Sequence, residues 1–174
     1  MTATAQHLET VERLKKISLF ETVKDDPEAM DTIARLFRTI SCGKGRDVLT
    51  EGEFGDELYI IKSGTVEVRK RTLHGDTYTV THLSAEQNIF FGEVALLDPD
   101  KRSATVTCTT DCEFYVLSRE KFVEMGDTNP ALGLNVTREL LRIICNRLRK
   151  ANADIITLFG ALVEEVSESG GLED

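Results

Sequence analysis

The chain is poor in the residues that build metal and redox centres. Its 174 residues include no tryptophan, three histidines and four cysteines. The cysteines form no Cys-x-x-Cys pair, and no histidine lies near them at the spacing of a zinc site. The four residues are Cys42, Cys108, Cys112 and Cys145. We interpret them as free thiols in a reducing cytoplasm, and we expect no metal and no cofactor.

Long apolar runs and an excess of positive charge are also missing. No apolar stretch approaches the ~20 residues needed to span a bilayer, and residues 1–10 lack the cationic start of a secretory signal. Lys and Arg number 21 against 30 Asp and Glu, which gives a net charge of -9. Such a chain repels a nucleic-acid backbone, so we expect no DNA binding. Because no apolar run is long enough to span a bilayer, we also expect no membrane contact. A single local arginine can still hold a small phosphate.

No grouping of side chains typical of catalysis stands out. There is no Ser-His-Asp or Cys-His set, and Gly43-Lys44-Gly45 lacks the spacing of a phosphate-binding P-loop. His74 and His82 form no His-x-His pair, which argues against the metal site of a cupin enzyme. The sequence therefore predicts a binding protein rather than an enzyme.

Hydrophobic spacing divides the chain into three structural segments. Apolar residues recur every three or four positions in residues 1–40, which predicts helices. Residues 41–118 contain short alternating runs separated by turn residues, which predicts strands. Residues 119–166 are helical again, and residues 167–174 are expected to be a frayed tail. We predict one mostly β domain, an antiparallel jelly roll or barrel with N-terminal helices and a long C-terminal helix.

The expected C-terminal helix carries a heptad repeat. Its two core positions hold, in chain order, Leu141, Ile144, Leu148, Ala151, Ile155, Leu158 and Leu162. Three such heptads predict that residues 141–162 pack against a second copy of the helix in a homodimer. The alternative is a long helix that lies on its own barrel.

The stretch from Phe91 to Val106 has the features of a pocket for a phosphorylated sugar. Gly92 permits close approach of a ligand to the backbone. The start of a short helix leaves N–H groups that attract anions. Arg102 can hold two phosphate oxygens, and Glu93 can accept hydrogen bonds from sugar hydroxyls. We predict the phosphate on Arg102 and the ribose on Glu93. The alternative is a surface ion pair between these two residues.

This stretch resembles the phosphate-binding cassette of cyclic nucleotide-binding domains. Such domains occur in bacterial catabolite activator-type regulators, cyclic-nucleotide-dependent kinases and gated channels. The shared pattern is Phe-Gly-Glu, an aliphatic residue and Ala-Leu, then a variable turn and Arg-small-Ala. It corresponds here to Phe91-Gly92-Glu93-Val94-Ala95-Leu96 and Arg102-Ser103-Ala104. Residues 45–68 also follow the family's first strands and turn glycines, and the resemblance covers residues 14–158.

The resemblance implies that the chain binds a cyclic nucleotide, with cAMP expected and cGMP as the alternative. It implies that Glu93 accepts from the ribose 2′-hydroxyl and that Arg102 pairs with the cyclic phosphate. The amides of Gly92, Ala95 and Ser103 would donate to ligand oxygens. For Ser103 the alternative is a strand residue with a solvated hydroxyl.

The same resemblance implies a pocket for the base. Val68, Val80 and Leu83 match positions that line it, and the C-terminal helix would cap the base through Asn152. An exposed polar role for Asn152 on the helix is equally open.

The chain departs from the family pattern in two places, in the loop before the cassette and after the long helix. Leu83 lies ten residues before Glu93, two more than usual, and Asn88 stands where the family has glycine. Because asparagine tolerates the left-handed conformation, we expect the turn to be kept. The longer loop at residues 84–89 leaves the shape of the base pocket open. Family regulators continue with a DNA-binding helix-turn-helix, for which the residues after the long helix leave no room.

These observations predict a stand-alone cytoplasmic sensor of a cyclic nucleotide. It would relay binding through its C-terminal helix to a partner protein. The alternative is a fold that has lost its ligand and acts as a protein-interaction scaffold. A transcription factor stays open only if the chain is part of a longer protein.

Overall fold

The computed structural model describes residues 3–169, which fall into two units divided after Glu139. The first unit contains all the described strands and the N-terminal helices. The second is the distal part of one long helix. Each unit is described by itself.

The first unit opens with helices that the sequence specifies locally. Helix α1 spans Ala3–Leu14 and helix α2 spans Pro27–Leu36, with the one-turn helix η1 (Ser18–Phe20) between them. The Asp26 carboxylate accepts from the first free N–H groups of α2 at 3.0 and 3.1 Å, and Pro27 supplies a preset φ. The helical segment was predicted to reach residue 40, and this is wrong. Phe37 is extended and Ile40 lies in a strand, because β1 pairs there with a strand far along the chain.

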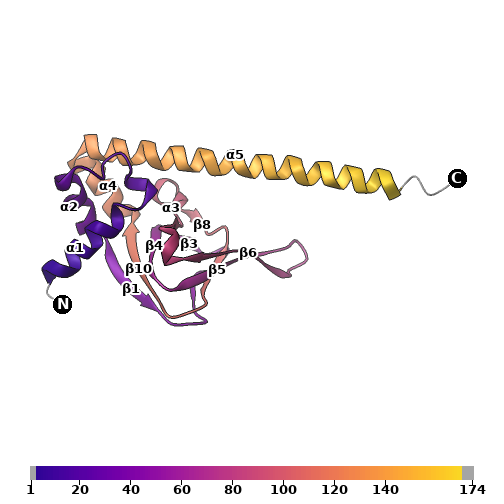
Figure 1. Cartoon of the computed structure of the whole chain (residues 1–174), viewed down its shortest axis with the longest axis horizontal. Coiled ribbons are helices and arrows are strands. Elements are labelled where there is room, and N and C mark those ends of the chain that lie inside the picture. Colours follow the sequence, from indigo (N-terminus) through magenta and orange to yellow (C-terminus); the bar gives the residue numbers. More distant parts are fainter. Residues whose placement is uncertain (1–2, 170–174) are drawn as a thin grey trace. The chain divides into compact units, whose positions relative to one another are not determined.

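The strands form two four-stranded antiparallel sheets and one two-stranded sheet. In order across the first sheet, they are β1 (Arg38–Cys42), β10 (Cys112–Ser118), β4 (Glu57–Ser63) and β7 (Phe90–Phe91). Across the second, they are β2 (Asp47–Leu49), β9 (Thr105–Cys108), β5 (Thr65–Arg71) and β6 (Thr77–Ser84). The third pairs β3 (Phe54–Gly55) with β8 (Asp100–Lys101). This arrangement confirms the predicted mostly β architecture (Figure 1).

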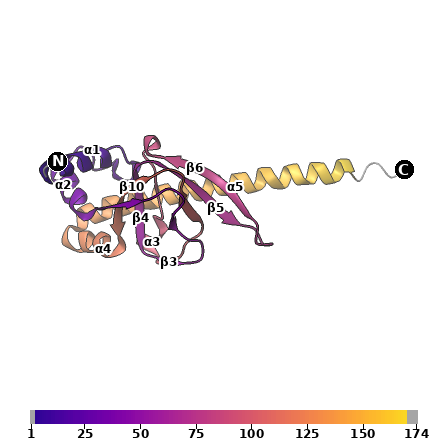
Figure 2. The ribbon, with the colours of Figure 1, turned by 90° about the horizontal axis from the view of Figure 1, so that it is seen from below.

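The core lies between the two large sheets. Tyr59 and Phe91 stack with centroids 5.5 Å apart, and Phe114 meets both edge-on. Val66 and Val106 pack against them from the second sheet. Beyond this core the β5–β6 hairpin extends past the other strands (Figure 2), and its residues 71–82 are exposed.

The long loop after β6 is a structured turn. Residues Ala85–Gln87 form the one-turn helix η2, closed by reciprocal hydrogen bonds between Ser84 and Gln87. Asn88 follows at φ 51°, so the expectation that asparagine would keep the left-handed turn is confirmed. Arg13 of α1 donates from Nη2 to the Ile61 carbonyl at 2.8 Å and also to the Ala85 carbonyl. The loop is thereby tied to α1 and β4.

Three helices complete the chain: α3 (Val94–Leu97), α4 (Arg119–Thr128) and α5 (Pro130–Ser169). The long C-terminal helix is confirmed, and Asn129 caps its start by accepting from the Leu132 N–H at 3.1 Å. Fraying was expected from Ser167, but α5 continues through Ser169. Residues 170–174 of that expected tail lie outside the described part. Within residues 3–169, no helix is long and apolar enough to cross a membrane.

Replacing Phe114 by alanine is expected to lower the free energy of unfolding by about 3–5 kcal/mol. The ring is fully buried, and the surrounding side chains relax only partly into the cavity that its removal leaves. Urea titration followed by circular dichroism measures this. Phe54→Ala is the matched control, since that ring is 75% exposed. Similar losses for both variants would contradict the core placement.

Candidate functional site

The stretch from β7 to β8 is a tight strand–turn–helix–turn. Gly92 follows β7 with φ at 74°, a conformation that residues with a side chain rarely adopt. A Cβ at this position would lie 2.8 Å from the Glu57 carbonyl and 3.1 Å from Arg102 Nη1. Glycine is therefore required both by the backbone angle and by the close packing around it.

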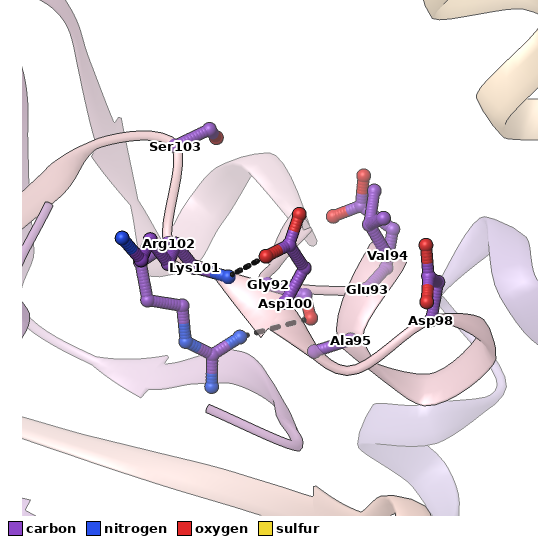
Figure 3. Close-up of a pocket in the computed structure, with 9 residues that line it drawn as sticks. All are labelled: Gly92, Glu93, Val94, Ala95, Asp98, Asp100, Lys101, Arg102 and Ser103. Carbon is purple, nitrogen blue, oxygen red and sulfur yellow. Dashed lines mark hydrogen bonds between the residues drawn. The ribbon is translucent and has the colours of Figure 1, made fainter. Parts of the chain in front are cut away.

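A cavity of 280 Å³ opens along this segment (Figure 3). Its lining residues are Gly92, Glu93, Val94, Ala95, Asp98, Asp100, Lys101, Arg102 and Ser103. The volume is close to the lower limit of about 300 Å³ for small-molecule pockets. The five residues predicted from the cassette pattern are thus brought together in one cavity.

Arg102 is held underneath Gly92. Its Nη1 donates to the Gly92 carbonyl at 3.3 Å, and the guanidinium points away from Ser103 (Figure 3). The guanidinium carbon lies 6.0 Å from the centre of the Tyr59 ring, within range of a cation–π attraction. A Cβ on Gly55 would overlap the guanidinium, with Cζ only 2.5 Å away. Two glycines and one aromatic ring therefore shape the seat of this arginine.

Tyr59 connects the site to a second arginine. Its hydroxyl donates to Glu57 Oε2 at 2.7 Å, and Glu57 Oε1 forms an ion pair with Arg38 at 2.5 Å. Burial, followed by the hydrogen bond to Glu57, raises the pKa of Tyr59, so the hydroxyl stays protonated. Gly55, Tyr59 and Glu57 were not among the residues expected at this site. They lie far from the cassette pattern along the chain, so that pattern does not indicate them.

Glu93 and Arg102 are both buried, at 7% and 9% exposure. The alternative of a surface ion pair is therefore wrong. Removing charged groups from water is costly, so buried charged side chains are paired or hydrogen-bonded. Three further charged residues of the lining, Asp98, Asp100 and Lys101, are exposed.

Comparison with known proteins identifies the family of this domain. Residues 39–129, just over half of the chain, match the family model of the cyclic nucleotide-binding domain. The chain belongs to this family.

Among its relatives is the CRP-like cAMP-activated global transcriptional regulator of Mycobacterium tuberculosis. It is 28% identical over 147 residues, which cover 84% of this chain and 62% of the relative. The cAMP-dependent protein kinase regulatory subunit of Yarrowia lipolytica is 42% identical over 78 residues, covering 45% of this chain and 20% of the relative. The chain thus spans less than two thirds of the length of these relatives. A cyclic nucleotide-binding domain from Methylobacillus flagellatus superimposes with a TM-score of 0.74 at 27% identity, over 89% of this chain and 85% of that one.

The domain's cassette amides differ in their availability. The Ala95 N–H donates to the Gly92 carbonyl at 3.3 Å, so this amide already has a partner. Ala95 is buried, whereas Ser103 is exposed at the rim. A ligand oxygen at Ala95 would have to compete with the Gly92 carbonyl.

The residues expected to line the base pocket lie outside this cavity. Val68 and Leu83 are half-buried and pack against the core, while Val80 on β6 is 50% exposed. Asn152 is an exposed residue of the second unit. Their contacts with a base stay predictions. Within the described range 3–169, no cluster of three or more His, Cys, Asp or Glu side chains could hold a metal ion.

Gly92→Ala is expected to destabilise the domain more than Gly75→Ala. Both positions have positive φ, but only Gly92 has a carbonyl within 2.8 Å of the new Cβ, whereas nothing lies within 4 Å at Gly75. The backbone angle lowers the stability of each variant by about 1 kcal/mol or more, and the clash lowers the stability of Gly92→Ala further. Thermal unfolding of both proteins measures the difference. Equal unfolding midpoints would argue against the close packing at Gly92.

Proposed function

We propose that this domain senses a cyclic nucleotide, with cAMP as the ligand and cGMP as the alternative ligand. One observation carries the proposal: a buried carboxylate and a buried guanidinium, Glu93 and Arg102, line the same small cavity. A ribose cyclic phosphate offers the hydroxyl donor and the anionic oxygens that these two groups require. The M. tuberculosis relative is described as cAMP-activated, which supports cAMP.

The ligand would act by replacing an internal hydrogen bond. Arg102 donates to the neutral carbonyl of Gly92. A phosphate oxygen is charged and is therefore the stronger acceptor. Its arrival would release the Gly92 carbonyl, to which the Ala95 N–H is also bonded, and so alter the first turn of α3. This contact would exist only in the bound state, which is what allows a ligand to shift a conformational equilibrium.

The output would pass through α5 to a partner protein. The first turns of this helix are anchored in the first unit by Leu132 and Val136, both buried. A rigid helix can carry a displacement of these turns along its length. We propose that Val68, Val80 and Leu83 contact the base of the nucleotide. The reduced state of the cysteines suits a cytoplasmic protein.

The second unit would form a homodimer through residues 141–162. Leu141, Leu148, Ile155 and Leu162 recur every seven residues and are 46–63% exposed in the single chain. A row of exposed large apolar side chains on one helix is favourable only when a partner covers it.

Arg102→Ala is expected to weaken cAMP binding by about 100-fold or more, because charge-assisted hydrogen bonds contribute about 1.5–3 kcal/mol each. Titration calorimetry with cAMP, and with cGMP in parallel, measures this and identifies the preferred base. Glu93→Ala should reduce the affinity by a smaller factor, since Glu93 would accept from one neutral hydroxyl, whereas Arg102 can make two hydrogen bonds to an anionic phosphate.

Arg35→Ala is the control, since Arg35 is an exposed residue of α2 whose partner is Asp31 on the same helix. Wild-type affinity in Arg102→Ala would show that the site assignment is wrong. No heat from either nucleotide in the wild-type protein would favour a scaffold that has lost its ligand.

Ile155→Asp is expected to raise the dimer dissociation constant by about 100-fold, because it places a charge at a core position of the helix pair. Ala153→Asp adds the same charge at an outward heptad position, so it controls for the effect of aspartate on the helix itself. Sedimentation equilibrium of the wild type and the two variants measures the three dissociation constants. A monomeric wild type, or equal dissociation constants for the two variants, would refute the dimer.

A further inference from the structure

Three of the four cysteines, each from a different strand, converge at one place in the first unit. Cys42 ends β1, Cys108 ends β9 and Cys112 begins β10. Cys108 and Cys112 belong to the buried core, and Cys42 packs against it. All three are free thiols.

Cys42 and Cys112 lie directly opposite each other in the antiparallel β1–β10 pair. Opposite residues of such a pair have Cα atoms about 4.5–5.5 Å apart and side chains on the same face of the sheet. A disulfide accepts Cα separations of about 4.4–6.8 Å. The backbone of this pair therefore already has the spacing of a cross-strand disulfide.

The pair is accessible from solvent. Cys42 and Cys112 both line a cavity of 280 Å³, which shares no lining residue with the nucleotide cavity. Cys42 is half-buried, whereas Cys112 is only 3% exposed, so a reagent meets Cys42 first. Asp111 and Glu113 also line this cavity, and their charges favour a neutral reagent over an anionic one.

The third thiol is unsuited to initiating the reaction. Burial, followed by the neighbouring thiols of Cys42 and Cys112, raises the pKa of Cys108 and keeps it protonated at neutral pH. Because the thiolate is the nucleophile, Cys108 is expected to be unreactive. Its place beside the pair supplies apolar packing.

We propose that Cys42 and Cys112 form a peroxide-reactive dithiol. In it, Cys42 reacts first with the peroxide, and Cys112 then converts the oxidised Cys42 into a disulfide. The Cys42 thiolate attacks one oxygen of the peroxide, the O–O bond breaks, and Cys42 becomes a sulfenic acid while the other oxygen leaves as water or an alcohol. The Cys112 sulfur then attacks the Cys42 sulfur, the S–OH bond breaks, and water leaves with the Cys112 proton. Two thiols lose two electrons and two protons, and one peroxide is reduced. The domain thereby gains an input that is chemically separate from its nucleotide site.

Treatment of the full chain with hydrogen peroxide tests the proposal. Intact mass should fall by about 2 Da through loss of two hydrogens, and the titratable thiols should fall from four to two. A non-reducing peptide map should contain a crosslinked Cys42–Cys112 peptide. Dithiothreitol should reverse all three changes.

Cys145→Ser is the matched control, because Cys145 is exposed on α5 and is expected to play no part. This variant should lose about 2 Da like the wild type, whereas Cys42→Ser and Cys112→Ser should not. A loss that persists in either of these two variants would overturn the assignment, as would a wild-type protein that gains oxygen without crosslinking. The wild-type peptide map decides the pairing even where a variant fails to fold.

Discussion

A buried arginine sets the conditions that the rest of the site must meet. The Arg102 guanidinium occupies space that exists only because Gly55 and Gly92 carry no Cβ, and it rests against the ring of Tyr59. Gly92 in turn needs positive φ to turn the chain into α3. The cassette, the two-stranded sheet that contains Gly55, and the central strand β4 are therefore mutually dependent. A change in any of them alters the position of the charge that would meet a phosphate.

The proposed contact with a phosphate would be made by this one arginine in an otherwise acidic chain. The net charge of -9 repels a phosphate at a distance. Burial in the fold leaves Arg102 little exposed to solvent, and electrostatic interactions are stronger where water is excluded. The cavity lining holds two cations, Lys101 and Arg102, against three carboxylates, Glu93, Asp98 and Asp100. The proposed attraction for a small anion would therefore come from direct contact with Arg102 and not from the net charge of the lining.

The two cavities use the same sheets in different ways. The cavity between Gly92 and Ser103, where we propose that the nucleotide binds, depends on a tight turn between strands and on charge. The cavity at Cys42 and Cys112 depends on strand register, because antiparallel pairing places two thiols opposite each other. A jelly roll offers both kinds of site, since its turns and its strand ends lie at the surface while its register is set by the core.

The sequence alone determined what is encoded locally. Asp26-Pro27 starts α2, Asn88 keeps the left-handed turn, and the Phe91–Ala104 pattern points to Glu93 and Arg102, which line one cavity. Each depends on residues that are close in the chain, so type and spacing suffice. Only the tertiary structure decided that Ile40 lies in a strand, that Gly55 and Tyr59 seat Arg102, and that three separate cysteines meet. Apart from Cys108 and Cys112, which are four residues apart, the residues in these contacts are distant from one another in the chain. Their energy comes from packing and pairing across the fold, which hydrophobic periodicity within one segment does not contain.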